Sequence, residues 1–253
     1  MTEPKVLYFD LETSPLTVVT FSLFKPIISI QQIREHARIL CWSAKWKGAK
    51  QRVKFDSEYH SDYLTMLTGI RDLLDEADIV VGYNSDSFDV RWVNAQFLKA
   101  GLELPSPYEK VDLYKVNKRA LYLASGKLDY LAQTLLGESK VTHSGITMWM
   151  DAMWGDEKAK ASAWRTFKKY AMKDTALLEP LHEKLLPFIR NVNVALYSDS
   201  EIACTHCGSD NIQRRGYRRT TAGTFQKYVC LDCKSWSYDP KRLDTTALRP
   251  MSA

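Results

Sequence analysis

Two carboxylates interrupt an apolar stretch near the beginning of the sequence. Residues 6–13 are rich in β-branched and aromatic side chains and are followed by Ser14-Pro15, which predicts a strand. Alternate side chains of a strand point to the same face, so Asp10 and Glu12 lie together. Two ionised acids on one face of a buried strand repel each other and lose hydration, so a cation has to offset their charge. A divalent metal such as Mg²⁺ would do so; the alternative is an edge strand with both acids in water.

The size and composition of the chain allow one substantial core and a small appendage. The chain has 253 residues, of which 45% are hydrophobic and 26% charged, as is ordinary for a soluble globular protein. No apolar stretch approaches the length of a membrane span and no signal peptide is visible, so we expect a cytoplasmic location. In that reducing compartment, cysteines are more often metal ligands or free thiols than disulfides.

The net charge of +5 is concentrated toward the C-terminus. From Glu201 onward there are nine Lys and Arg residues and five acids, which leaves a charge of only +1 for the first 200 residues. A basic tail beside a nearly neutral body indicates a polyanion such as nucleic acid as partner, with solubility as the plain alternative.

The order of the expected elements predicts an α/β fold, a mixed sheet with helices on both faces. We expect the following strands and helices: strands over 38–46, 51–55, 78–83 and 111–113, and helices over 62–76 and 88–100. Helices dominate from there to about residue 190. Residues 16–38 show no clear pattern and are interpreted as a long connection or a local insertion. The predicted organisation is a domain over 1–190, a linker over 191–200 and a tail over 201–253.

A carboxylate lies in the middle of an apolar helical stripe. Residues at spacings of three and four form this stripe: Trp164, Phe167, Ala171, Asp174, Leu178, Leu181 and Leu185. Tyr170 precedes Asp174 by four residues, so its phenol should lie beside that carboxylate. Pro180 is expected to kink or interrupt the helix near residue 177. After such a break, Asp174 would have the plainer role of capping a second helix.

A third acidic position follows the strand predicted over 78–83. Asp89 ends the segment Asn84–Asp89 and lies at the start of a predicted helix, where an aspartate commonly caps free backbone N–H groups. Asp86, Ser85 or Ser87 could each provide that cap, so Asp89 is not obliged to do so, but taken alone Asp89 is interpreted as structural rather than catalytic.

These acids and the tyrosine resemble, in type and order, the motifs of the DEDD-type 3′–5′ exonuclease superfamily. The likeness is greatest to its Tyr-containing branch and to the proofreading domains of B-family DNA polymerases. It covers about residues 5–190 and includes residues 127–140, which are similar to a segment that precedes the last motif in those domains. Ala171 departs from the pattern, since relatives often have Asn after the tyrosine. The motifs are Asp10-x-Glu12, Asn84–Asp89 and Tyr170-x₃-Asp174.

The resemblance implies a ribonuclease H-like fold and hydrolysis of phosphodiester bonds by two Mg²⁺ or Mn²⁺ ions about 4 Å apart. In this arrangement Asp10 bridges both ions, Glu12 and Asp174 bind the ion on the side of the nucleophile, and Asp89 reaches the other ion through water. Tyr170 would orient the attacking water, because a phenol with a pKa near 10 is a poor base at neutral pH.

The expected substrate is single-stranded nucleic acid, DNA rather than RNA, with Asn84 among the residues that contact it. The alternative is a catalytically silent nucleic-acid-binding protein that uses the same fold as a platform. A complete set of repelling acids argues against that alternative, since binding alone does not require them.

Two C-x₂-C pairs predict a metal site in the tail. Cys204 and Cys207 are separated by 22 residues from Cys230 and Cys233. Four thiolates at such spacing typically hold one structural Zn²⁺, and the residues between the pairs read as a hairpin, so we expect a zinc ribbon. Disulfides or a redox pair are the alternatives, and His206 could compete as a ligand.

The predicted ribbon carries arginines close to aromatic residues, a mixture typical of combined phosphate contact and base stacking. We therefore expect Arg214, Arg215, Arg218 and Arg219 to bind nucleic acid. The alternative is that the ribbon docks a protein partner or the body of the enzyme. A fifth cysteine, Cys41, lies in an apolar strand and is interpreted as an unreactive core thiol.

Overall fold

The computed structural model describes residues 3–50, 53–142 and 144–244. The chain divides into two compact units, Lys5–Leu181 and a second unit that contains the chain from His182 onward. Among the helices of the described residues, none combines the length and the apolar character needed to cross a membrane.

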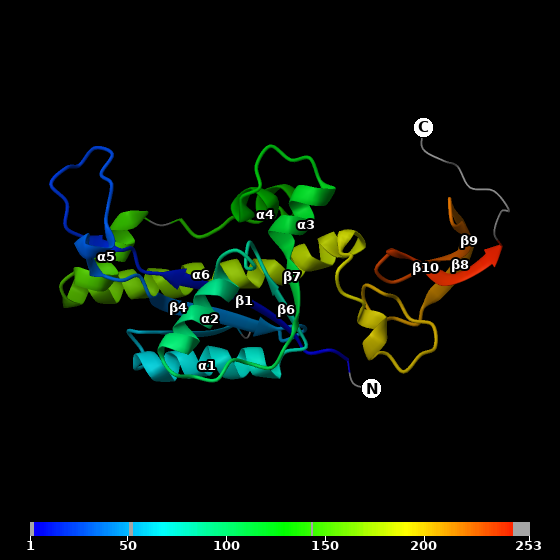
Figure 1. The fold of residues 1–253 in the computed structure, drawn as a ribbon, viewed down its shortest axis with the longest axis horizontal. Helices are drawn as coiled ribbons and strands as arrows, with labels where there is room; N and C mark the ends of the chain where they lie inside the picture. The colour runs from blue at the N-terminus through cyan, green and yellow to red at the C-terminus, as the bar shows by residue number, and fades with distance from the viewer. Residues whose placement is uncertain (1–2, 51–52, 143, 245–253) are drawn as a thin grey trace. The chain divides into compact units, whose positions relative to one another are not determined.

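The first unit is built on a five-stranded mixed sheet with the order β5-β4-β1-β6-β7 (Figure 1). The strands are β1 (Val6–Thr13), β4 (Ile39–Trp46), β5 (Lys54–Ser57), β6 (Ile79–Gly82) and β7 (Glu109–Asp112). β4 is antiparallel to β1 and to β5, whereas β6 is parallel to β1 and to β7. The predicted mixed sheet is confirmed, and β1 lies in its middle, so the edge-strand alternative is wrong.

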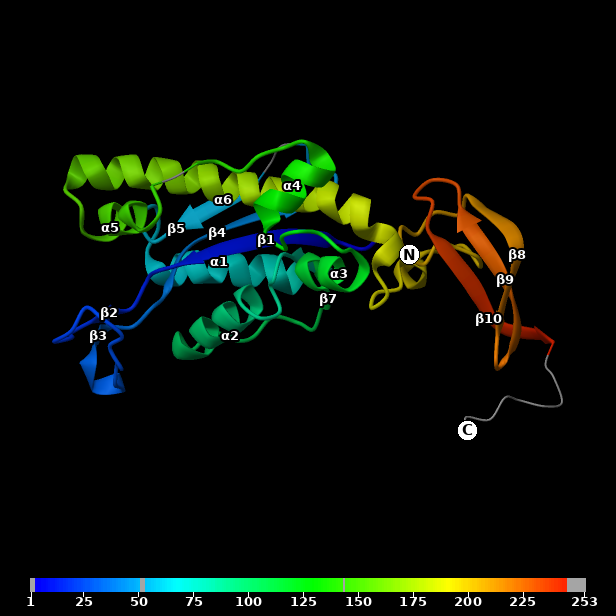
Figure 2. The same cartoon turned by 90° about the horizontal axis from the view of Figure 1, so that it is seen from above.

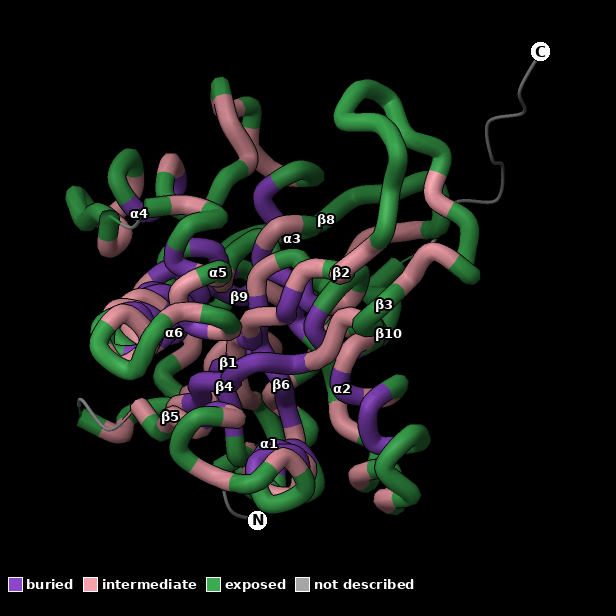
Figure 3. The backbone as a smooth tube through the Cα atoms, turned by 90° about the vertical axis from the view of Figure 1, so that its left-hand side faces the viewer, coloured by how far each residue is buried: buried purple, intermediate pink, exposed green. Residues whose placement is uncertain are grey.

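Helices cover both faces of this sheet (Figure 2). They are α1 (Tyr63–Glu76), α2 (Asp89–Lys99), α3 (Leu113–Ala120), α4 (Leu128–Leu136), α5 (Ile146–Trp154) and α6 (Glu157–Leu185). On one face, α1 and α2 bury an apolar core with Leu7 and Phe9 of β1. On the other, α5 and α6 pack over Leu40 and Cys41 of β4. Figure 3 shows the buried strands β1, β4 and β6 between these layers.

Most expected elements lie within a few residues of the observed ones. The stretch 16–38 contains a short antiparallel pair, β2 (Thr17–Val18) and β3 (Ile33–Glu35), and the 3₁₀ turn η1 (Ile30–Gln32). Residues 51–52 of the strand expected over 51–55 lie outside the described residues. The strand expected over 111–113 ends one residue earlier, because the Asp112 carboxylate accepts the N–H of Tyr114 and so begins α3.

The interruption predicted at Pro180 does not occur. Helix α6 runs through this residue without a break, so Asp174 lies inside a continuous helix and the helix-cap alternative is wrong. A proline in a helix removes one backbone hydrogen bond. Buried leucines on both sides, Leu177, Leu178 and Leu181, gain enough from burial to hold the helix together across this position.

Helix α6 is fastened to β4 by hydroxyl groups in the core. Ser43 Oγ donates to the carbonyl oxygen of Ala171 at 2.9 Å and lies 2.6 Å from the Thr175 hydroxyl. Because all three residues are fully buried, these polar groups need each other as partners. The register of α6 over the sheet is thereby fixed next to Asp174.

The second unit contains a three-stranded antiparallel sheet with the order β10-β9-β8. Its strands are β8 (Ile212–Thr220), β9 (Gly223–Cys230) and β10 (Trp236–Asp244), so the expected hairpin gains a third strand. Two 3₁₀ turns precede the sheet, η2 (Leu186–Phe188) and η3 (Val194–Tyr197). η3 falls within residues 191–200, the predicted linker.

Candidate active site

The register of the sheet turns two carboxylates of β1 toward α6. Asp10 lies opposite Ser43 and Glu12 opposite Cys41, and directly opposed residues share a face. Ser43 is bonded to α6 and Cys41 packs in the core beneath it. The even positions of β1 therefore place both acids under the helix, while the apolar odd positions face α1 and α2.

A cavity of about 570 Å³ opens at this point. It brings together all the predicted catalytic residues and Asn84, from β1, the loop after β6, α2 and α6. The residues that line it are Asp10, Leu11, Glu12, Tyr83, Asn84, Phe88, Asp89, Lys127, Leu128, Asp129, Lys140, Tyr170 and Asp174.

The tight turn after β6 carries Asp89 into the cavity. A Cβ atom at Gly82 would lie 2.5 Å from the Ser85 side chain, so the turn requires glycine there. Asn84 adopts a left-handed conformation with φ 61°, and its N–H donates to Asp112 at 2.8 Å. Asn and Asp tolerate this conformation better than other non-glycine residues. Gly82, through its close approach to Ser85, and Asn84, through its left-handed backbone, thus fix the path of the loop.

Asp89 is the first residue of α2, yet its carboxylate accepts a hydrogen bond from the backbone of strand β1. Oδ1 accepts the backbone N–H of Leu11 at 3.1 Å in a buried setting. β1 pairs with β6 only from Val6 to Tyr8, so this N–H lies beyond the last pair between the two strands. Asp89 thereby takes the place of a neighbouring strand as the partner of this N–H. Its carboxylate is bonded to Leu11, the residue that follows Asp10 in β1.

Helix α6 brings Tyr170 and Asp174 to the opposite wall. The Asp174 side chain is buried, and its Oδ2 forms an ion pair with Lys140. Its Oδ1 is also buried and has no hydrogen-bond partner among the described residues. A buried carboxylate oxygen without a partner is costly, so this atom fits the position of a metal ligand.

Burial raises the pKa of the acids in the cavity. The pKa of Asp10 rises well above its usual value through desolvation and then through the charges of Asp89, Glu12 and Asp174. Desolvation and the Asp174 carboxylate raise the pKa of Glu12 to about 8, and desolvation raises that of Asp89 to about 7. The pKa of Asp174 is raised by desolvation although Lys140 opposes the change.

The positive charge in the cavity falls short of the negative charge. Five of its lining residues are acidic and two, Lys127 and Lys140, are cationic. Ionising the whole cluster therefore needs additional cations, and carboxylate oxygens suit hard divalent metals. The donor set fits such ions.

Tyr170 remains a protonated phenol in this setting. Desolvation and the charges of Glu12, Asp174 and Asp10 raise its pKa above the ordinary value near 10. Its side chain hydrogen-bonds to Glu12 and to Asp174, which lowers the pKa of each of these acids against the larger effect of burial. Tyr170 is therefore suited to donate a hydrogen bond and unsuited to remove a proton.

Lys140 is a site residue that the sequence reasoning did not identify. Its Nζ contacts Asp174 and lies 5.3 Å from the centre of the Tyr170 ring. The backbone N–H of Lys140 donates to the Asp129 carboxylate at 3.0 Å, and the nearby Glu138 forms an ion pair with Lys173 of α6. The sequence marks residues 127–140 only by their likeness to a family, because nothing in the spacing from Lys140 to Asp174 indicates their contact.

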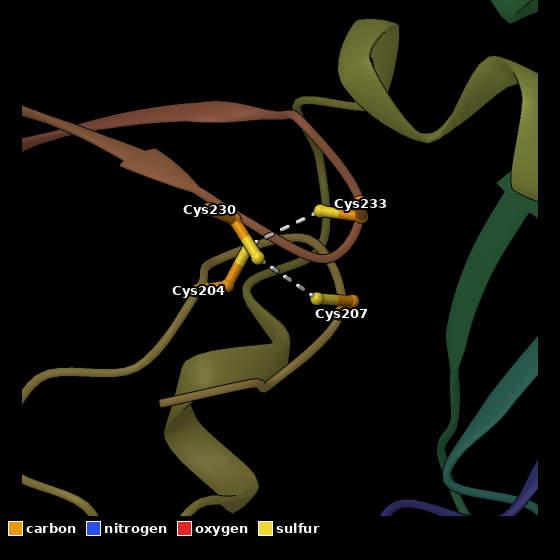
Figure 4. A group of neighbouring side chains, drawn as sticks. All are labelled: Cys204, Cys207, Cys230 and Cys233. Atoms are coloured by element: carbon orange, nitrogen blue, oxygen red, sulfur yellow. Dashed lines mark hydrogen bonds between the residues drawn. The ribbon is translucent and has the colours of Figure 1, made fainter. Parts of the chain in front are cut away.

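In the second unit, the four predicted zinc ligands form one cluster (Figure 4). All their sulfur atoms lie within 4.8 Å of one another. Cys204 and Cys233 are 3.5 Å apart and Cys207 and Cys230 are 3.7 Å apart. Neither pair is at the ~2.05 Å of a disulfide bond, and both separations are close to the ~3.8 Å between sulfurs of a tetrahedral zinc site. The cluster fits a zinc ribbon.

The other sequence candidates of the second unit lie outside this cluster. His206 contacts the Thr205 hydroxyl at 3.0 Å, and burial lowers its pKa. The four predicted arginines are all exposed on β8. They do not share one face of the strand, since Arg215 and Arg218 contact rings of β10 whereas Arg214 lies opposite Tyr228 of β9.

Comparisons with known proteins agree with this architecture. No curated protein sequence matches the chain. Among solved structures, the chain is similar to the family B DNA polymerase from the hyperthermophilic archaeon Pyrobaculum calidifontis, with a TM-score of 0.54 and 21% sequence identity. The match covers 73% of this chain but only 25% of the polymerase, so the chain spans about a quarter of that protein. The model of the RNase H superfamily matches residues 7–186. The chain therefore belongs to the RNase H superfamily.

Proposed function

We propose that this chain is a metal-dependent exonuclease that removes nucleotides from the 3′ end of single-stranded nucleic acid, DNA more readily than RNA. The observation that carries the proposal is the set of four acids with raised pKa values that meet Tyr170 in one open cavity, two of which, Asp89 and Asp174, are buried. The likeness to a DNA polymerase supports DNA as the substrate.

Four carboxylates would hold the metal: Asp10, Glu12, Asp89 and Asp174. Two Mg²⁺ or Mn²⁺ ions, when bound, supply a hydroxide-like nucleophile at neutral pH and neutralise the leaving oxygen. Asp10 interacts electrostatically with each of the other three acids, so its carboxylate would contribute to holding the metal beside all of them. Asp174 offers its unpartnered Oδ1.

The remaining residues of the cavity position the reactants. The protonated Tyr170 holds the attacking water through a hydrogen bond and thereby aligns it with the phosphorus. Lys140 orients Asp174 through its ion pair and brings a positive charge to the side of the cavity that α6 forms. Phe88 and Leu128 line the same cavity and offer apolar surfaces against which an unpaired terminal base can stack.

A catalytically silent binding protein would gain nothing from this cluster. Each acid raises the free energy of its neighbours when ionised, and burial adds to that cost. Apolar or amide side chains at these positions would allow the same fold to bind nucleic acid without that free-energy cost. The retained acids therefore favour catalysis.

Replacing Asp10 or Asp174 by Asn should abolish hydrolysis, because each change removes a charged metal ligand at nearly constant volume. We expect a loss of about 10³-fold or more, equivalent to several kcal/mol of transition-state stabilisation. The assay follows 5′-labelled single-stranded DNA and RNA with Mg²⁺ or Mn²⁺, resolving products nucleotide by nucleotide. Glu157→Gln, an exposed charge removal on the same helix as Asp174, is the control. Full Mg²⁺-dependent activity in folded Asp10→Asn would refute the site.

Tyr170→Phe should lower kcat by about 10- to 100-fold with little change in KM, since the lost hydroxyl acts on water and not on the bound strand. Steady-state kinetics on a labelled oligonucleotide measures both constants. Tyr122→Phe, which alters a fully exposed tyrosine, is the matched control. An unchanged kcat would show that Tyr170 is only a packing residue.

The first unit without divalent metal should lose stability as the pH rises from about 4 to about 8. Its acids have folded-state pKa values above their unfolded values, for example about 8 for Glu12 against 4.5. The folded state therefore holds more protons, and stability falls as the pH passes the unfolded and then the folded pKa values. Thermal unfolding at pH 5 and pH 8 tests this, and Asp10→Asn should raise the midpoint most at pH 8. Added Mg²⁺ should stabilise more at pH 8 than at pH 5; the opposite order would contradict the metal assignment.

Replacing Cys204 and Cys207 together by Ser should remove one Zn²⁺ per chain and unfold the second unit, because metal binding supplies folding free energy to so small a sheet. The first unit has its own core and should stay folded. Elemental analysis and limited proteolysis report the two effects. Cys41→Ala, which changes a cysteine outside the cluster, should keep its zinc. An unchanged zinc content in the double variant would exclude the ribbon site.

A further inference from the structure

The pairing register sorts the side chains of the ribbon sheet onto two different faces. On β9 and β10, Tyr238 lies opposite Lys227 and Trp236 opposite Val229. On β8, Arg218 lies opposite Phe225 of β9. Because directly opposed residues share a face and alternate residues return to it, cations and aromatic rings of all three strands gather on one side.

Cations lie over rings throughout this side of the sheet. The Arg218 guanidinium is 4.1 Å from the centre of the Tyr238 ring. Lys227 and Arg215 lie 5.0 and 5.8 Å from the Trp236 ring. Phe225 meets the edge of Tyr238 with ring centres 5.7 Å apart. We call this set the aromatic face; it consists of Arg215, Arg218, Phe225, Lys227, Trp236 and Tyr238.

The opposite face has a different character. Arg214 lies opposite Tyr228, Arg219 opposite Thr224 and Tyr217 opposite Gln226. This side therefore carries two of the four predicted arginines and one exposed tyrosine. Of the contacts between cations and rings found among the described residues of this sheet, all lie on the aromatic face.

The rings of the aromatic face are open to solvent. Trp236 is 47% exposed and Tyr238 46%. A groove of about 770 Å³ runs beside them, and Arg190, His206 and Arg218 contribute to its walls. Among the described residues that line the groove, none is acidic. A basic groove next to half-exposed rings is complementary to a strand that presents phosphates and unpaired bases.

We propose that the aromatic face and its groove bind single-stranded nucleic acid, with bases stacked on Trp236 and Tyr238 and phosphates held by Arg215, Arg218 and Lys227. The inference rests on the proposed function, in that the same polymer is the substrate of the first unit. Stabilisation of the small sheet does not account for the face, since the four-cysteine cluster already provides a folding constraint.

The test measures binding by the full-length chain in the Asp10→Asn background, so that the strand is not degraded, and without chelator, so that zinc is retained. A fluorescent oligothymidine serves as the probe, with a duplex of the same length as competitor. Arg215→Gln/Arg218→Gln is compared with Arg214→Gln/Arg219→Gln, which removes the same charge from the same strand. Tyr238→Ala is compared with Tyr217→Ala, since Tyr217 is similarly exposed at 52% but lies on the opposite face.

We expect the Arg215/Arg218 pair and Tyr238→Ala each to weaken binding of the single strand about tenfold or more, while their matched controls change it less than about threefold. The arginine pair should also reduce the slope of log Kd against log salt by about 1.4, the value for two phosphate contacts on a single strand. Duplex should compete poorly, because its bases offer no free faces.

Equal losses from both arginine pairs would overturn the proposal in favour of diffuse charge attraction. Unchanged binding in all four variants would also overturn it and leave a protein partner for this face. Hydrolysis is measured separately, with the same ribbon substitutions made in a chain that keeps Asp10. If hydrolysis occurs and the aromatic face has no effect, the inference fails alone; if the face-specific loss occurs without any hydrolysis, the proposed function fails alone. Zinc content and circular dichroism verify that each variant is folded.

Discussion

Four carboxylates from three separate elements share one open cavity, and their mutual repulsion is opposed by the ammonium of Lys140. Bringing them together costs free energy that the rest of the first unit has to supply. The cost is met by apolar layers on both faces of the sheet, which bury most of β1 and β4. Without such a core, the acids would separate into water.

The cavity depends on several precise anchors, because acids that repel each other do not find their positions by attraction. Asp10 and Glu12 are held by the pairing of β1 with β4. Asp174 is held by the hydroxyl contacts that fasten α6 to Ser43. Asp89 is held by the amide of Leu11. Each anchor is a hydrogen bond in a buried setting, where geometry is most restrictive.

Much of this arrangement could be predicted from local sequence. Alternation in β1 placed Asp10 and Glu12 on one face, and helical spacing paired Tyr170 with Asp174, because both patterns are properties of single elements. The cysteine spacing likewise predicted the cluster. Asp89 needed the resemblance to a family, since its local context suggests only a cap.

What the sequence did not predict depends on contacts between elements. Lys140 lies far along the chain from Asp174, and no periodic pattern connects them. The loss of one backbone hydrogen bond predicts a kink or interruption at Pro180, but that local rule does not include the burial of neighbouring leucines. The sequence gives no reason to divide the four ribbon arginines, and only the strand register places them on two faces.

The hydrogen bond from the Leu11 amide to Asp89 has a further consequence. The amide belongs to the backbone of β1, between Asp10 and Glu12, yet it points at the carboxylate of another element. Its proton resonance therefore senses directly how the electron density of Asp89 is shared between the strand and any cation. In a proton–nitrogen-15 correlation spectrum, the chemical shift of the Leu11 amide would report how far the cavity is occupied by cations, without substrate and without turnover.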